Sequence, residues 1–133
     1  MDLVTRLDLI EQKPLEDGYG HHGGRLWEVF TAETIGTEAL RLLVQEYGPG
    51  GYTKDHPIHT RNEQAYYVVE GEMTVEIDGV EHQAAAGSFV FIPRGARHDH
   101  RNAGTGRLVF LTINVPVRDG EVPPVRHHAP GRP

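Results

Sequence analysis

The segment Asp55–Gln64, with the sequence DHPIHTRNEQ, contains the densest group of side chains that could bind a metal ion or move a proton. It places His56 and His59 close to a glutamate and a glutamine, and His98 lies further along the chain. The chain of 133 residues has nine histidines and no cysteine, so a metal would be bound by nitrogen and oxygen atoms. These residues are therefore candidate metal ligands.

Glu63 and Gln64 compete for the role of oxygen ligand, because successive side chains of a strand point to opposite faces. If Gln64 points inward, Tyr66 lies on the same inner face. If the strand is shifted by one residue, Glu63 and Tyr67 point inward instead. Strand alternation by itself permits either arrangement, and the choice decides whether the site carries a negative charge.

Short strands must position these side chains, because glycines, prolines and Asp-Gly pairs divide the chain into short segments. The clearest strand pattern lies within residues 64–83, where Met73, Val75 and Ile77 alternate with polar residues and Asp78-Gly79 favours a type I′ hairpin turn. Further strands are predicted at 25–30, 39–47, 88–93 and 107–115. No helix longer than a turn or two is predicted, so the expected fold class is all-β.

The segment Gly87–Asn102, GSFVFIPRGARHDHRN, combines a strand, a turn restricted by Pro93 and Gly95, and His98 at the start of the next strand. Its spacing, G-x5-P-x-G-x2-H-x3-N, resembles the second conserved motif of the cupin superfamily at every fixed position. This resemblance implies a cupin-type jelly-roll β-sandwich or barrel, in which the histidine side chain turns into the interior.

The first cupin motif, G-x5-H-x-H-x3or4-E-x6-G, is matched at its two ends. Gly50 and His56 fit its beginning, and Gln64 and Gly71 fit its end. Between them, two residues instead of one separate the histidines, and glutamine replaces the usual glutamate. The six-residue spacing to Gly71 selects the glutamine as the inward residue, unless the strand slips by one position.

By this resemblance the interior holds one divalent metal ion, with zinc, iron, manganese and nickel as candidates. The implied ligands are His56, His59, Gln64 and His98. Because His56 and His59 are three residues apart, they would nominally face opposite sides of a strand. A bulge at Pro57-Ile58 would bring them together. Without it, one of the two histidines would not contact the metal directly.

His100 and Tyr66 are the candidate catalytic residues. His100 follows His98 on the same face and could be a further ligand, a general base or a residue that lines the pocket. Tyr66 would hydrogen-bond the substrate from the pocket wall or pack in the core. The pairs His21-His22 and His127-His128 lie in glycine- or proline-rich segments, so they are predicted to be solvated loop or tail residues.

Three neutral imidazoles and a neutral glutamine would leave the full +2 charge on a metal ion, which favours Lewis-acid chemistry on an anionic oxygen ligand. The segments EVFTAETIG, YYVVEGEMTVEIDG and PRGARH also resemble small aromatic polyketide cyclases of the tetracenomycin and resistomycin type. This resemblance implies a metal-dependent enzyme acting on a small carbonyl- or enol-bearing substrate, with His100 or a metal-bound hydroxide as general base. An iron- or nickel-dependent dioxygenase and a non-catalytic binding protein are the alternatives.

The net charge of −6 disfavours nucleic acid and anionic membranes as partners, so a small-molecule partner is expected. No apolar run approaches the roughly 18 residues of a membrane span, and a cytoplasmic location is expected.

The length predicts one cupin domain, residues 1–133, with an N-terminal arm and loop (1–24), a barrel (25–117) and a Pro-rich tail (118–133). The apolar arm Leu3–Ile10 has no evident partner in the barrel. It therefore predicts a homodimer in which the arm is covered.

Overall fold

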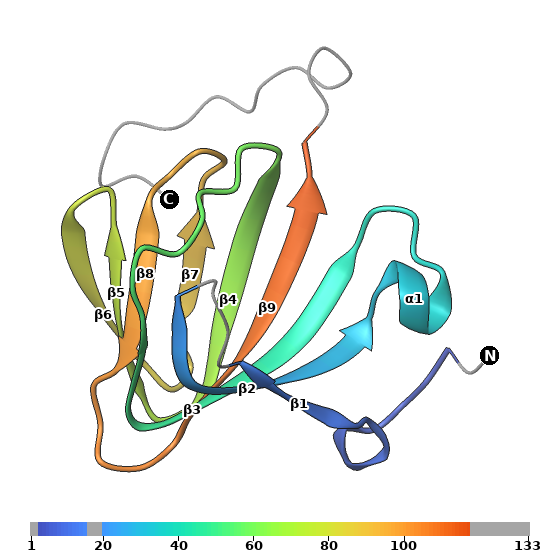
Figure 1. Ribbon diagram of the computed structural model, residues 1–133, viewed down its shortest axis with the longest axis horizontal. Coiled ribbons are helices and arrows are strands. Elements are labelled where there is room, and N and C mark those ends of the chain that lie inside the picture. The colour runs from blue at the N-terminus through green and yellow to red at the C-terminus, as the bar shows by residue number, and fades with distance from the viewer. Residues whose placement is uncertain (1–2, 16–19, 118–133) are drawn as a thin grey trace.

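The computed structural model describes residues 3–15 and 20–117, and strands make up most of these ranges (Figure 1). No helix within this part of the chain is long and apolar enough to cross a membrane. The strands are β1 (Gln12–Leu15), β2 (His21–Phe30), β3 (Arg41–Thr53), β4 (Asn62–Glu70), β5 (Glu72–Ile77), β6 (Val80–Ala85), β7 (Phe89–Ile92), β8 (His98–Asn102) and β9 (Leu108–Pro116). The helices are a 3-10 turn, η1 (Leu7–Leu9), and the single-turn α1 (Ala32–Ile35).

The strands form one antiparallel sheet in the order β6-β5-β8-β3-β9-β4-β7, and β1 and β2 extend it beside β3. Strands that are neighbours in the sheet are mostly distant in sequence, which is the connectivity of a jelly roll. Figure 1 shows the sheet curling until its two sides face each other across the interior. The all-β jelly-roll prediction is confirmed.

The hairpin of β5 and β6 turns at Asp78 and Gly79, which have φ angles of 48° and 83°. Two consecutive residues with positive φ define the type I′ turn that matches the twist of the strands. The turn residues therefore set the register in which Ile77 pairs with Val80. This hairpin has the position and the turn type that the sequence predicts.

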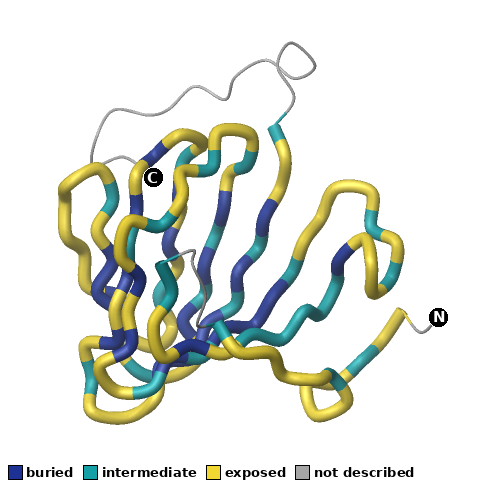
Figure 2. Tube along the Cα trace, viewed as in Figure 1, coloured by how far each residue is buried: buried dark blue, intermediate teal, exposed yellow. Residues whose placement is uncertain are grey.

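The strand β4 points Tyr66 and Val68 into the core, where they are 3% and 0% exposed. Tyr67 and Val69 lie on the opposite face, and Val69 is exposed. The strand therefore has the register that places Gln64 inward, and the alternative with Tyr67 inward is excluded. Figure 2 shows this alternation as dark blue and lighter positions along the central strands.

The sheet begins earlier in the chain than residue 25, because β1 and the first residues of β2 belong to it. The prediction that His21 and His22 lie in a loop is wrong: both lie in β2 and pair with Thr53 and Tyr52 of β3. The predicted tail, with its pair His127-His128, lies outside the described residues.

Candidate metal centre and its cavity

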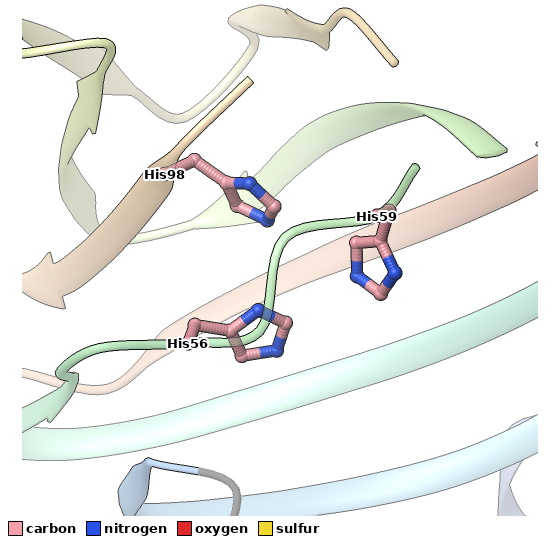
Figure 3. Close-up of side chains that lie close together, drawn as sticks. All are labelled: His56, His59 and His98. Atoms are coloured by element: carbon pink, nitrogen blue, oxygen red, sulfur yellow. The ribbon is translucent and has the colours of Figure 1, made fainter. Parts of the chain in front are cut away.

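Three histidines converge in the interior of the barrel (Figure 3). His56 and His59 lie in the loop between β3 and β4, and His98 begins β8. One ring nitrogen of each lies within 4.8 Å of the others, and the ring centroids are 5.2–5.7 Å apart. The predicted bulge at Pro57-Ile58 is absent from this described segment, because the loop is not a strand and its side chains need not alternate.

Hydrogen bonds from two neighbouring segments hold this loop. The backbone N–H of Gly95 donates to the carbonyl oxygen of His59 at 2.7 Å, so the turn of the second motif fixes one end. The carboxylate oxygen Oδ1 of Asp99 accepts from the N–H of His56 at 3.2 Å and from the hydroxyl of Thr53 at 2.9 Å. Sequence analysis did not identify Asp99 as a supporting residue, although it stands between His98 and His100.

Gln64 lies on the inner face of β4 and is 6% exposed, whereas Glu63 is exposed. The Gln64 amide nitrogen Nε2 donates to Oδ1 of Asn114 at 2.5 Å. This bond orients the amide so that its oxygen, Oε1, is buried without a hydrogen-bond partner among the described residues. A buried acceptor without a partner costs about 1–3 kcal/mol, so this oxygen is suited to a ligand role.

His98 and His100 also present ring nitrogens that have no partner within the described ranges: Nε2 of His98 and both nitrogens of His100. His100 is buried among the rings of Tyr47, Phe110 and Tyr66, at centroid distances of 4.9, 5.2 and 6.0 Å. The three converging imidazoles, together with the unpaired amide oxygen of Gln64 on the wall of the same cavity, match the nitrogen and oxygen donors that a divalent transition metal prefers. The residues present therefore fit a metal ion.

Burial keeps the histidines of this site neutral. It lowers the pKa of His56 to about 4, with smaller contributions from the neighbouring His21, His98 and His59. Burial is also the first cause of the lowered pKa of His59, His98 and His100. Neutral imidazole is the form that binds metal, so no proton has to be displaced at neutral pH.

Tyr66 keeps its proton for a similar reason. Burial, and then the negative charge of Asp99, raises the pKa of the Tyr66 hydroxyl above its ordinary value. The phenol is therefore a hydrogen-bond donor at neutral pH.

His56 and His59 open into a cavity of about 460 Å³, which Gln64, Tyr66 and His100 also line, while His98 is buried next to them. This volume suits a small organic molecule. His21 lines the cavity as well, its Nδ1 lies 2.7 Å from the Tyr47 hydroxyl, and its ring meets that of His56 edge-on at 4.8 Å.

A register break explains why His21, and not His22, faces the cavity. Gly24 faces inward opposite Tyr47, and simple alternation would place His22 on the same side. The pairing of β2 with β3 shifts between His22 and Gly24, so the inward position passes to His21. His22 is exposed and stacks on Tyr52 at 4.6 Å.

Comparison with known proteins identifies a family for most of this barrel. The profile of the cupin domain family matches residues 43–114. The chain is 33% identical over 90 residues to the polyketide synthase CurC of Streptomyces cyaneus, a match that covers 66% of this chain and 58% of that protein. It is 30% identical over 90 residues to quercetin 2,3-dioxygenase of Bacillus subtilis, covering 65% of this chain and 26% of the relative.

A solved structure supports the fold. The polyketide cyclase RemF from Streptomyces resistomycificus superposes with a TM-score of 0.73 at 22% identity, covering 89% of this chain and 81% of that one. The chain spans less than two thirds of the length of the two curated relatives above, so their whole activities do not transfer to it directly.

Proposed function

Because the chain belongs to the cupin family, we propose that it is a metal-dependent enzyme acting on a small carbonyl- or enol-bearing substrate, with polyketide cyclase-like chemistry. The observation that carries this proposal is the neutral donor set inside a cavity: three imidazoles that converge within 4.8 Å and the unpaired oxygen of Gln64. The resemblance to CurC, which is named as a polyketide synthase, supports a polyketide as the kind of substrate.

His56, His59, His98 and Gln64 would hold the metal ion. All four ligands are neutral, so a bound divalent ion would act as a Lewis acid that stabilises negative charge on a substrate oxygen.

His100 is the candidate general base. Both its ring nitrogens are buried without a hydrogen-bond partner in the described chain, so one of them is free to accept a proton from a carbon next to the substrate carbonyl. Burial lowers the pKa of His100 and weakens it as a base, so the negative charge formed on the substrate would have to stabilise the imidazolium. Tyr66 lies on the same wall with a protonated hydroxyl, which can donate a hydrogen bond to a substrate oxygen and orient it. Tyr66 would thus position the carbonyl while His100 removes the proton.

Exchange of carbon-bound protons tests this proposal without knowledge of the natural substrate. Protein loaded with Zn²⁺, Mn²⁺ or Ni²⁺ is incubated with 2-oxobutyrate in D₂O, and deuterium incorporation next to the carbonyl is followed by NMR. We expect the loaded protein to accelerate exchange, and His100→Gln to reduce the acceleration by a factor of about 10²–10⁴, the usual contribution of a general base. Exchange that is no faster than with free metal ion would count against the proposal.

An iron- or nickel-dependent dioxygenase is the second candidate, favoured by the match to quercetin 2,3-dioxygenase. The same cavity would then hold an aromatic enol beside the metal. Oxygen uptake by iron- or nickel-loaded protein during turnover of an aromatic enol separates the two functions, because the Lewis-acid reaction consumes no oxygen. A protein that binds metal and ligand but turns over neither kind of substrate would be a non-catalytic binding cupin.

A further inference from the structure

A row of polar side chains crosses the inner face of the sheet beside the candidate metal centre. Arg41 of β3 pairs with Asn114 of β9, and Asn114 pairs with Gln64 of β4. All three line the cavity. Neighbouring strands are about 4.8 Å apart, so the backbone of Arg41 lies on the order of 10 Å from that of Gln64. The row therefore connects the candidate metal ligand Gln64 with the positively charged side chain of Arg41.

Arg41 is the only lysine, arginine, aspartate or glutamate among the described residues that line this cavity. The positive charge of Arg41 contributes to the lowered pKa of His59, after burial and the effect of His98, which agrees with its place beside the histidines. The cavity wall thus offers one full positive charge and no carboxylate.

The nearest carboxylate, Glu28, does not cancel this charge. Its oxygen Oε2 lies 3.6 Å from Nη2 of Arg41, while its other oxygen accepts a hydrogen bond from Lys13 at 2.5 Å. Arg41 therefore shares its one ion-pair partner within the described ranges with Lys13, and it is half-exposed at the edge of the cavity, where its guanidinium is accessible to a ligand. The guanidinium has five N–H donors, so donors remain for a second acceptor.

We propose that Arg41 forms a subsite for a carboxylate of the substrate, which selects anionic carbonyl compounds over neutral ones. This inference rests on the proposed function, because it places the substrate carbonyl at the histidines and the carboxylate several atoms away. A planar guanidinium binds a carboxylate through two parallel hydrogen bonds, so the contact also orients the ligand.

Two probes that differ only in charge test the subsite: 4,6-dioxoheptanoate and its methyl ester. Each has a diketone that can bind metal, and only the first has a distant carboxylate. Binding to Co²⁺-loaded protein is followed by the visible absorption of the metal at neutral pH. We expect wild-type protein to bind the acid more tightly, and Arg41→Gln to weaken the acid about tenfold, or roughly 1.4 kcal/mol, while leaving the ester unchanged.

Arg101→Gln is the matched control, because Arg101 is exposed, pairs with Glu81 and does not line the cavity. It should leave the affinity for both probes unchanged. If Arg41→Gln lowered the affinity for both probes equally, or for neither, the subsite would be overturned while the proposed function stands. If neither probe binds the wild-type protein, the proposed function fails and the subsite with it.

Discussion

At the scale of single residues, the choice between Glu63 and Gln64 decides the charge of the candidate centre. Gln64 is buried with an unpaired amide oxygen, and Glu63 is exposed on the other face. A carboxylate in this place would reduce the net charge of a divalent ion and its ligands from +2 to +1. That change would weaken the attraction of the centre for anionic oxygen, so the register of β4 determines chemistry as well as packing.

We predict that Gln64→Ala lowers metal affinity by at least about 10–100-fold, while Glu63→Ala leaves it unchanged. This is the usual loss when a residue that only supports a metal ligand is removed. The reason is that Gln64 lines the cavity with an unpaired amide oxygen, whereas Glu63 does not line it. Gln64→Glu should retain or tighten metal binding, because a carboxylate also ligates, yet reduce Lewis acidity. Metal titration followed by elemental analysis measures the metal affinity of all three variants. Loss of metal in Glu63→Ala with retention in Gln64→Ala would contradict the placement of β4.

At the scale of elements, hydrogen bonds from neighbouring segments hold the loop at 54–61, which has no regular secondary structure. The loop carries two of the three converging histidines, and its backbone bonds lead to the turn at Gly95 and to Asp99 on β8. Asp99 also holds Thr53, whose hydroxyl oxygen accepts from the N–H of His100 at 3.0 Å. Residues of the Gly87–Asn102 motif therefore position the histidines of the Gly50–Gly71 motif.

We predict that Asp99→Ala destabilises the protein by about 1–3 kcal/mol, because the N–H of His56 and the hydroxyl of Thr53 lose their acceptor. Metal affinity should fall as well, since His56 is no longer fixed. Asp99→Asn is the matched variant, because its amide oxygen can still accept both bonds, so it should retain most of the stability and affinity. Chemical denaturation and metal titration measure the two effects. Equal behaviour of the two variants would show that the charge of Asp99, and not its hydrogen bonds, is what matters.

The elements that local residue patterns determine were predictable from the sequence. The Asp78-Gly79 turn follows from turn chemistry, the inward position of Gln64 follows from its six-residue spacing to Gly71 in the cupin-like motif, and both are found in the structure. The loop around His59 and the cavity position of His21 were not predictable in this way. Each depends on pairing with a segment far away in sequence: the turn at Gly95 for the loop, and the register break against β3 for His21.

At the scale of the whole molecule, the barrel buries four neutral histidines inside a chain with a net charge of −6. Burial penalises their protonated forms, and only at His98 do nearby carboxylates, those of Asp99 and Asp78, partly offset this effect on the pKa. Bound metal would remove part of the penalty of burying unpaired nitrogens. The same groups therefore link metal binding, pH and the stability of the fold.

We predict that stability falls as the pH is lowered from about 7 towards 4, and that metal raises stability down to about pH 5. The folded pKa of His56, about 4, lies below the unfolded value near 6.5, so between these values the unfolded chain binds more protons and stability decreases with falling pH. The lowered pKa values of His59, His98 and His100 act in the same direction.

Thermal unfolding of chelator-treated and Zn²⁺-supplied protein, measured at several pH values, checks this linkage. Metal binds only the folded state, so ion at 100 times its Kd should add about 2.7 kcal/mol at neutral pH. Because protons compete with metal only near or below the folded pKa of the ligands, about 4 for His56, the gap between the two samples should persist down to about pH 5 and close towards pH 4. His82→Gln, at an exposed histidine of β6, should leave both curves unchanged, whereas His98→Gln should remove the gap. A gap that closes already near pH 6.5, or that is still open well below pH 4, would mean that the ion binds to groups other than these histidines.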